Sequence, residues 1–179
     1  VAFNSDGSQA ATCAADNSVQ LWNTTTGEVI QRLVGHTAAV VGIAITSSNA
    51  EVITASADKT VRVWTAADGK IARTITAPAA ISQLAVSRDG TRIAVALPDS
   101  TVQIYGAADG ALAHTLAGHQ EAVSILTFSG DGTRLMSADA NRAIVRDSAT
   151  GRVLEILPIA QGISAAVFGA TSAEVSLAR

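Results

Sequence analysis

A short phrase repeats along the chain about every 41 residues, and this spacing limits the folds that the chain can adopt. The phrase is most complete at residues 56–64, Ser-Ala-Asp-Lys-Thr-Val-Arg-Val-Trp. Its aspartate and its final aromatic residue recur at spacings of 42 and 41 residues, as Asp16, Asp58 and Asp99 and as Trp22, Trp64 and Tyr105. A repeat of this length predicts an array of similar supersecondary units that stack on one another.

Each repeat contains four short apolar runs that are separated by turn residues. In the second repeat the runs are residues 40–46, 51–56, 60–64 and 71–75. Asp-Gly pairs or single glycines punctuate the runs, and no window between turns exceeds about eight residues, which is short for a helix. The sequence therefore predicts an all-β fold of β-propeller blades, each with four antiparallel strands, comprising about four blades and the start of a fifth.

The blade limits follow from the same spacing. The predicted blades are residues 1–34, 35–76, 77–117 and 118–157, with an incomplete blade at 158–179. One such sheet cannot bury both of its faces, so the blades must stack face to face. Hydrophobic residues make up 48% of the chain and aromatic residues only 3%, so alanine and aliphatic side chains must build the core.

The array is expected to be part of a larger propeller. Propellers typically close with 4–8 blades of four strands, whereas this pattern stops after two runs of its fifth repeat, at 163–168 and 173–177. The apolar residues of those runs need a neighbour. Further blades of the same chain would provide one and are favoured, because Val1 starts in mid-pattern without Met. A second copy or another subunit would also serve.

The second repeat adds a Gly-His pair, Gly35-His36, to its Ser-x-Asp and Trp elements, and Gly118-His119 recurs in the fourth. This combination resembles the WD-repeat (WD40) family of β-propellers over nearly the whole chain. The resemblance implies a hydrogen-bonded network that links the connection before each blade to its third strand. Its members would be His36, Ser56, Asp58 and Trp64 in the second repeat, and His119, Ser137 and Asp139 in the fourth.

The other repeats depart from the pattern of the family. Ala14 and Leu97 replace the serine of the first and third repeats, and Thr76-Ala77 stands where the third Gly-His pair belongs. Tyr105 and Arg146 occupy the tryptophan position of the third and fourth repeats. We expect these blades to depend more on apolar packing than on the polar network.

No catalytic, metal-binding or cofactor-binding motif is present, so a non-catalytic protein without a cofactor is predicted. His114 falls in an outer strand, and the other two histidines have structural roles by resemblance. The alternative is a propeller enzyme, or a small-ligand propeller, with a central site. Such a site needs acidic, His or Asn ligands from several blades, and the innermost runs 40–46 and 123–128 contain none.

The resemblance implies a scaffold that binds other proteins through the faces of its blades. The candidate partner-binding residues lie in the loops that carry the motifs: Thr37, Lys59, Gln120, Glu121, Asn141 and Arg142. These side chains would also suit ordinary solvated turns, and the sequence does not identify the partner. Further blades or a second copy are the other predicted partners.

Charge and hydropathy indicate which partners to exclude. A net charge of −3 and scattered basic residues give no reason to expect a nucleic-acid partner. No apolar run approaches the roughly 18 residues that would span a bilayer. Cys13 is the only cysteine, so no internal disulfide can form, which favours the cytoplasm.

Overall fold

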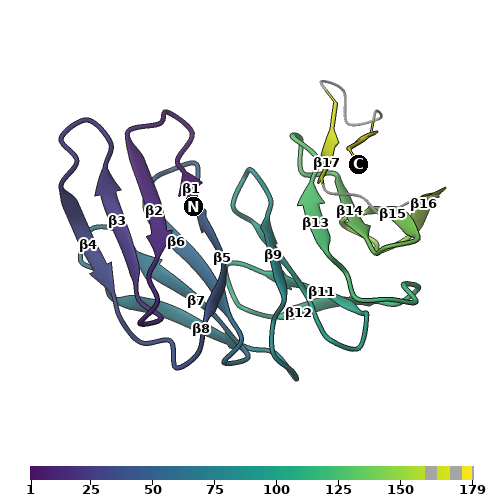
Figure 1. Ribbon diagram of the computed structural model, residues 1–179, viewed down its shortest axis with the longest axis horizontal. Helices are drawn as coiled ribbons and strands as arrows, with labels where there is room; N and C mark the ends of the chain where they lie inside the picture. The colour runs from purple at the N-terminus through teal and green to yellow at the C-terminus, as the bar shows by residue number, and fades with distance from the viewer. Residues whose placement is uncertain (160–164, 170–174, 179) are drawn as a thin grey trace. The chain divides into compact units, whose positions relative to one another are not determined.

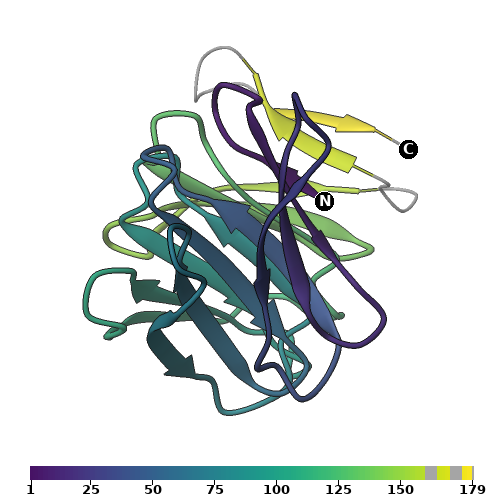
Figure 2. The same cartoon turned by 90° about the vertical axis from the view of Figure 1, so that its left-hand side faces the viewer.

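The computed structural model describes residues 1–159, 165–169 and 175–178, which form strands and their connections. Four sheets of four antiparallel strands follow one another along the chain, and a two-stranded sheet comes last (Figures 1 and 2). This arrangement confirms the predicted all-β fold with about four blades and part of a fifth. Among the described residues, no helix is long and apolar enough to cross a membrane.

The chain divides into two compact units, Val1–Ile81 and Ser82–Arg179. The first unit holds two sheets, which we call the first and second blades. The first blade consists of β1 (Ala2–Phe3), β2 (Gln9–Cys13), β3 (Val19–Asn23) and β4 (Val29–Leu33). The second blade consists of β5 (Val40–Ile45), β6 (Glu51–Ser56), β7 (Thr60–Thr65) and β8 (Ile71–Thr76). In both blades each strand pairs with the next one in sequence.

The second unit holds the third and fourth blades and a strand pair. The third blade consists of β9 (Gln83–Val86), β10 (Arg92–Ala96), β11 (Val102–Gly106) and β12 (Leu112–Leu116). The fourth consists of β13 (Ile125–Phe128), β14 (Arg134–Ala138), β15 (Arg142–Asp147) and β16 (Val153–Pro158). The last pair is β17 (Ala165–Phe168) and β18 (Val175–Ala178). Residues 163, 164, 173 and 174 of the predicted fifth-blade runs lie outside the described residues.

Two inner strands begin two residues after a buried apolar residue. β9 starts at Gln83, after Ile81, and β13 starts at Ile125, although the predicted run 123–128 begins at Val123. Ile81 and Val123 are nevertheless buried, at 2% and 3% exposure. Each residue thus packs into the core before its strand begins to pair, so hydrophobicity extends the apparent strand by two residues.

A tight turn joins the third and fourth strands of every full blade. Its glycine has φ near +70°, as at Gly69 (67°) and Gly151 (71°), a conformation that costs glycine little because it has no Cβ. The amide of Gly69 donates to the carbonyl of Thr65 at 2.9 Å, and the β7–β8 register shifts at Val63/Trp64. This bulge sets the register of the outer strand.

Neighbouring blades pack face to face within each unit. In the first unit, Ala11, Val19, Leu21 and Leu33 of the first blade pack against Val52, Trp64 and Ala66 of the second. Because side chains alternate across a strand, the residues that share a face with Trp64 point toward the first blade. The polar site that is described below lies on this face of the second blade.

The second unit repeats this packing. Alanine and aliphatic side chains of the third blade, such as Ala94 and Ile104, share a core with Leu126 and Leu135 of the fourth. The fourth blade places Met136, Ala138, Ala143 and Val145 in a further cluster with Ala166 of β17. Small side chains thus fill the space between sheets in a chain that has few aromatic residues.

Candidate functional site

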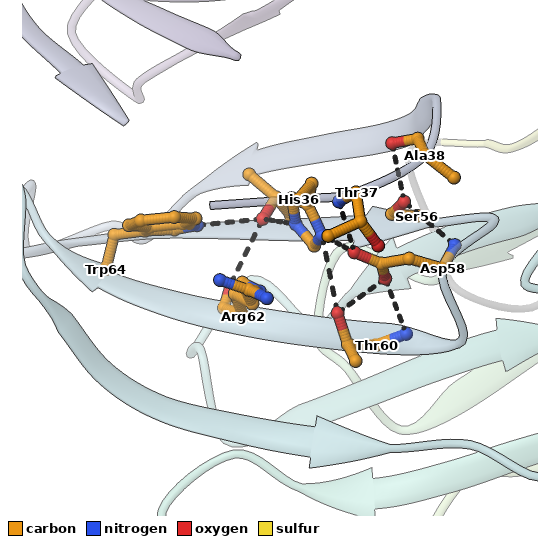
Figure 3. A network of polar contacts seen from close by, with 9 residues as sticks. His36, Thr37, Ala38, Ser56, Asp58, Thr60, Arg62 and Trp64 are labelled. Carbon is orange, nitrogen blue, oxygen red and sulfur yellow. Dashed lines mark hydrogen bonds and ion pairs between the residues drawn. The ribbon is translucent and has the colours of Figure 1, made fainter. Parts of the chain in front are cut away.

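His36 lies in the connection between β4 and β5, and both of its ring nitrogens are bound (Figure 3). Its Nδ1 lies 2.8 Å from Asp58 Oδ2, and its Nε2 lies 2.7 Å from Thr54 Oγ1. The side chains of His36 and Asp58 are only 1% and 5% exposed. A carboxylate can only accept, so Nδ1 carries the proton and Nε2 accepts the hydroxyl proton of Thr54.

Trp64 on β7 completes this line of hydrogen bonds. Its Nε1–H donates to Thr54 Oγ1 at 2.8 Å, so Thr54 accepts from the indole and donates to His36. The rings of Trp64 and His36 meet edge to face, with centroids 6.0 Å apart. Burial lowers the pKa of His36 despite the neighbouring Asp58, so the ring is neutral at pH 7, as this order of donors requires.

The carboxylate of Asp58 closes the network at the β6–β7 turn. Its Oδ1 accepts from the amide and the hydroxyl of Thr60, at 2.9 and 2.6 Å. Its Oδ2 also accepts from the amide of Thr37 at 3.0 Å. Burial alone would raise the pKa of Asp58, but the hydrogen bonds from Thr60, His36 and Thr37 outweigh it and hold the pKa well below its usual range.

The structure places Ser56 beside this line rather than within it. Ser56 Oγ donates to the carbonyl of Ala38 at 2.9 Å and accepts from the amide of Asp58 at 3.0 Å. It therefore ties the connection before β5 to the β6–β7 turn. The hydroxyl between His36 and Trp64 belongs to Thr54, which was not among the network residues predicted from the sequence.

The register of β6 and β7 explains the role of Thr54. Val52 pairs with Trp64 across the two strands, and Thr54 is two residues beyond Val52, so Thr54 shares a face with the indole. The sequence signal that could have identified it is a hydroxyl residue four positions before the turn aspartate. Thr12 has the same relation to Asp16 in the first blade.

The fourth blade holds His119 in a similar way. His119 Nδ1 lies 2.9 Å from Asp139 Oδ2, and Nε2 lies 2.7 Å from Ser137 Oγ. The two charged or ionisable side chains, His119 and Asp139, are 1% and 0% exposed. Burial lowers the pKa of His119. Burial would raise the pKa of Asp139, but hydrogen bonds from Asn141 and His119, among others, lower it to about 2.

A shorter turn accounts for the different position of the serine. Asp139 comes directly after Ala138, and four residues separate Ala138 from its paired residue Ala143. In the second blade five residues separate the paired residues Ala55 and Val61. The hydroxyl partner of the histidine therefore lies two residues before Asp139 but four residues before Asp58.

Arg146 takes the place of the tryptophan in the fourth blade. It pairs with Leu135, as Trp64 pairs with Val52. Its guanidinium donates to the carbonyls of Ala117 and Gly151, and its Nε has no hydrogen-bond partner among the described residues. Burial lowers the pKa of Arg146. Ser137 consequently receives no indole N–H.

The first and third blades contain no equivalent histidine within the described residues. In the first blade, Trp22 Nε1 donates to Thr12 Oγ1 at 2.8 Å. In the third, Val95 stands at the hydroxyl position, and the hydroxyl of Tyr105 donates to Gln103 Oε1. Within the described residues, the network that includes a histidine is therefore found in the second and fourth blades.

The candidate partner-binding residues lie within three residues of His36, Asp58, His119 or Asp139 in sequence. Thr37, Lys59, Gln120, Glu121 and Asn141 are exposed, whereas Arg142 is half-buried. Arg142 Nη1 donates to the carbonyl of Gly118 at 3.4 Å. Thr37 and Lys59 belong to the first unit, and the other four belong to the second. Each unit thus presents a separate group of candidate residues.

The geometry offers little for metal or acid–base chemistry in the part of the chain that is described. No group of three or more His, Cys, Asp or Glu side chains lies close enough there to hold a metal ion. The buried histidines use both ring nitrogens in hydrogen bonds. His114 Nε2 lies 2.8 Å from the carbonyl of Ala149. The hydrogen bonds of the two buried histidines are therefore suited to holding the loops in place.

Comparisons with known proteins give two family matches. Residues 3–104 match the family described as the first β-propeller of WD repeat-containing protein 75. Residues 110–145 match the WD domain, or G-beta repeat. A search of curated proteins finds no match. The first match covers more than half of the chain and spans the first two blades and part of the third.

Proposed function

Because the chain belongs to the WD-repeat family of β-propellers, we propose that it acts as a non-catalytic scaffold that binds other proteins. Propeller domains of this family generally mediate protein interactions. The proposed contact surfaces are five exposed side chains and the half-buried Arg142, in or beside the loops that carry the buried histidines and the turn aspartates. They comprise Thr37 and Lys59 in the first unit, and Gln120, Glu121, Asn141 and Arg142 in the second.

The observation that carries this proposal is the way in which the loops are anchored. The amide of Thr37 donates to Asp58 at 3.0 Å, and the amide of Gln120 donates to Asp139 at 3.2 Å. Both residues are exposed, yet the backbone that carries them is fixed by a buried carboxylate. A side chain that projects from an ordered backbone loses less conformational entropy on binding.

The chemistry of the loops favours a partner with polar contacts. Lys59 provides a cation, Glu121 an anion and Asn141 an amide, and all three are exposed. The aromatic side chains that dominate many binding hot spots are absent from the six candidate residues. We therefore expect charge and hydrogen bonding to set specificity, with an affinity that falls as salt concentration rises.

Affinity capture with matched charge swaps tests the proposal. The test variant is Lys59→Glu with Glu121→Lys, and the control is Lys70→Glu with Glu155→Lys. Each pair changes one exposed residue in each unit and leaves the net charge unchanged. Proteins enriched by the wild type should be retained by the control and lost by the test variant. The most enriched partner is then purified, and its affinity should fall at least about tenfold, or about 1.4 kcal/mol.

Two results would contradict this proposal, the first its contact residues and the second its non-catalytic role. One is capture of the same proteins, with the same affinity, by the wild type and the test variant. The other is tight, stoichiometric metal in elemental analysis of the purified protein, which would instead favour a propeller with a central metal site.

A further inference from the structure

In two blades a hydroxyl group caps a backbone carbonyl at the turn between the first and second strands. In the fourth blade the carbonyl of Gly132 accepts from Ser148 Oγ at 2.6 Å. In the first blade the carbonyl of Gly7 accepts from Thr24 Oγ1, also at 2.6 Å. Both hydroxyls belong to the residue that directly follows the third strand of the same blade.

The third blade supplies a second donor to the capped turn of the fourth. Arg92 Nη1 donates to the carbonyl of Gly132 at 3.3 Å and to Ser148 Oγ at 3.2 Å. Arg92 begins β10, so its side chain shares a face with Ala94, which packs in the core between the third and fourth blades. The carbonyl of Gly132 therefore has two donors, and one of them is a cation.

The same place in the first unit lacks both donors. Asn49 is the counterpart of Gly132, because each has a positive φ in this turn and an amide that donates to the carbonyl three residues earlier. Ala66 follows β7 in place of the hydroxyl residue, and Gln9 begins β2 in place of Arg92. The carbonyl of Asn49 therefore has neither the hydroxyl nor the cation that its counterpart has.

Two side-chain oxygens of this region are also without a donor. Gln9 Oε1 and Asn49 Oδ1 are buried and have no hydrogen-bond partner in the described part of the chain. Gln9 shares a face with Ala11, which packs in one core cluster with Ala66 of the second blade. Gln9 thus faces the second blade, and buried oxygens of this kind normally accept a hydrogen bond or contact an ion.

The carboxylate of Asp6 adds a negative charge beside these oxygens. Asp6 lies in the β1–β2 turn and is exposed. Hydrogen bonds from Ser8, and smaller contributions from Asn4 and Asn49, lower the pKa of Asp6. Asp6 is therefore ionised at pH 7 and lies next to the side chain of Asn49. The first unit gathers oxygen acceptors in the place where the second unit has a guanidinium.

We propose that the first unit binds a hard metal cation of the size of Ca²⁺ between its β1–β2 and β5–β6 turns. The ligands are the carboxylate of Asp6, the side-chain oxygens of Gln9 and Asn49, and the backbone carbonyl of Asn49. Carboxylate, amide and backbone carbonyl oxygens are the ligands that Ca²⁺ takes in proteins. The cation supplies the positive charge that Arg92 supplies in the second unit.

The burial of the two amide oxygens favours a small ion over water. A water molecule would lie about 2.7–2.8 Å from each oxygen, whereas Ca²⁺ binds oxygen at about 2.3–2.6 Å and so needs less space. Only one of the ligands is charged, so the affinity is low. We expect a Kd of about 0.1–1 mM, in the range of the weaker calcium sites of proteins.

The inference does not rest on the scaffold role. Its three residues, Asp6, Gln9 and Asn49, lie at the β1–β2 turn, the start of β2 and the β5–β6 turn, and none is a candidate partner-binding residue. A site of such low affinity loses its ion when the purified protein is desalted. It therefore gives no tight, stoichiometric metal in the elemental analysis that tests the scaffold role, and the two proposals can fail separately.

Calorimetric titration of the desalted protein with CaCl₂ at constant ionic strength tests the inference. We expect saturable binding of Ca²⁺ with a Kd of about 0.1–1 mM and at least about tenfold weaker binding of Mg²⁺, which needs shorter bonds and retains its waters. Asp6→Asn and Asn49→Gly should each weaken Ca²⁺ binding at least about tenfold. Asp89→Asn is the matched control, because Asp89 accepts from the amide of Thr91 as Asp6 accepts from that of Ser8, and it should bind as the wild type does.

A further variant rebuilds the arrangement of the fourth blade in the first unit. Gln9→Arg with Ala66→Ser adds the guanidinium and the hydroxyl that Arg92 and Ser148 provide. This variant should bind no Ca²⁺. In urea denaturation, Ca²⁺ should raise the midpoint of the wild type but not that of the variant. Circular dichroism checks that every variant is folded, and Asp6→Asn decides the matter if the rebuilt variant does not fold, because Asp6 is exposed.

Four outcomes would overturn the inference. The first is no saturable Ca²⁺ binding up to about 10 mM, ten times the weakest expected Kd. The second is equal affinity for Ca²⁺ and Mg²⁺, which would indicate adventitious binding to surface carboxylates only. The third is wild-type affinity in folded Asp6→Asn or Asn49→Gly. The fourth is wild-type affinity in the folded variant with Gln9→Arg and Ala66→Ser.

Discussion

Arg146 occupies in the fourth blade the cross-strand position that Trp64 occupies in the second. The two residues pair with Leu135 and Val52, respectively, and they are 6% and 1% exposed. Trp64 satisfies its N–H with the hydroxyl of Thr54, whereas Arg146 buries a guanidinium whose Nε has no partner among the described residues. The same place in the fold is therefore polar in one blade and apolar in the other.

This relationship predicts that Arg146→Trp stabilises the protein. An indole would remove a buried charge and provide an N–H for Ser137, whose hydroxyl already contacts His119 at 2.7 Å. We expect the free energy of unfolding to rise by about 1 kcal/mol, measured by urea denaturation. The reverse change, Trp64→Arg, is the control and should destabilise the second blade. A lower midpoint for Arg146→Trp would show that the guanidinium is well accommodated.

A second prediction concerns the hydroxyl that joins two rings. Thr54→Val keeps the shape of the side chain but leaves Trp64 Nε1–H and His36 Nε2 without their shared partner. Because both rings are buried, we expect a loss on the order of 1–3 kcal/mol. Thr12→Val in the first blade is the matched control. It removes one hydrogen bond from the half-buried Trp22 and should cost less in urea denaturation.

The comparison of Thr54→Val with Ser56→Ala tests the order of the network directly. Ser56 Oγ bonds to two backbone groups, the carbonyl of Ala38 and the amide of Asp58. Its loss should leave the environment of Trp64 unchanged, so the tryptophan fluorescence should match that of the wild type. Thr54→Val should alter that fluorescence. Identical spectra for the two variants would contradict the proposed line from Trp64 to Asp58.

The repeat spacing allowed the sheets to be predicted, because the turns are set by local chemistry. Glycines with positive φ, such as Gly69 and Gly151, are visible in the sequence as regular punctuation. The partner of His36 and Trp64 was not visible in the same way. Thr54 acts through the cross-strand register, whereas Ser56 lies closer to Asp58 in sequence, so local spacing pointed to Ser56 and not to Thr54.

A third prediction compares the aspartates of two turns. Asp58→Ala removes the acceptor for His36, Thr37 and Thr60, so buried donors lose their partner. We expect a loss on the order of 1–3 kcal/mol. Asp99 accepts only from Thr101 among the described residues, and it is exposed, so Asp99→Ala should cost less. Equal thermal midpoints for the two variants would rule out a stabilising role for the network.

A fourth prediction is that acid destabilises the protein in two stages. Burial lowers the pKa values of His36 and His119, so below about pH 6.5, the usual histidine pKa, the unfolded chain binds protons that the folded chain does not. Stability therefore falls as pH drops from that value through the folded-state pKa values of the two histidines. Above that range, these groups give no pH dependence.

The second stage comes from the aspartates. The pKa of Asp58 is held well below its usual range, and that of Asp139 is lowered to about 2. Their stabilisation is complete above about pH 4, the unfolded-state value, and is lost as pH falls toward the folded-state values. Urea denaturation from pH 8 to pH 2.5 measures both stages. His36→Asn with His119→Asn should remove the slope below pH 6.5 and retain the loss below pH 4, and a wild-type curve that is flat between pH 7 and pH 5 would contradict the first stage.

The last prediction concerns a lysine in an unfavourable backbone conformation. Lys59 follows Asp58 in the β6–β7 turn with φ of 71°, and Asn17 and Ser100 hold the same place after Asp16 and Asp99, with φ of 66° and 64°. Asparagine adopts this left-handed region more readily than lysine does.

Lys59→Asn should therefore raise the free energy of unfolding by about 0.5–1 kcal/mol, and Asn17→Lys should lower it by a similar amount. Lys70→Asn is the control for loss of charge, because Lys70 is exposed and is not among the residues with positive φ, and it should leave the urea midpoint nearly unchanged. Equal midpoints for Lys59→Asn and Lys70→Asn would show that the turn stores no strain at Lys59. A stabilised Lys59→Asn variant that also loses partner binding would indicate that the lysine is retained for its contacts rather than for the fold.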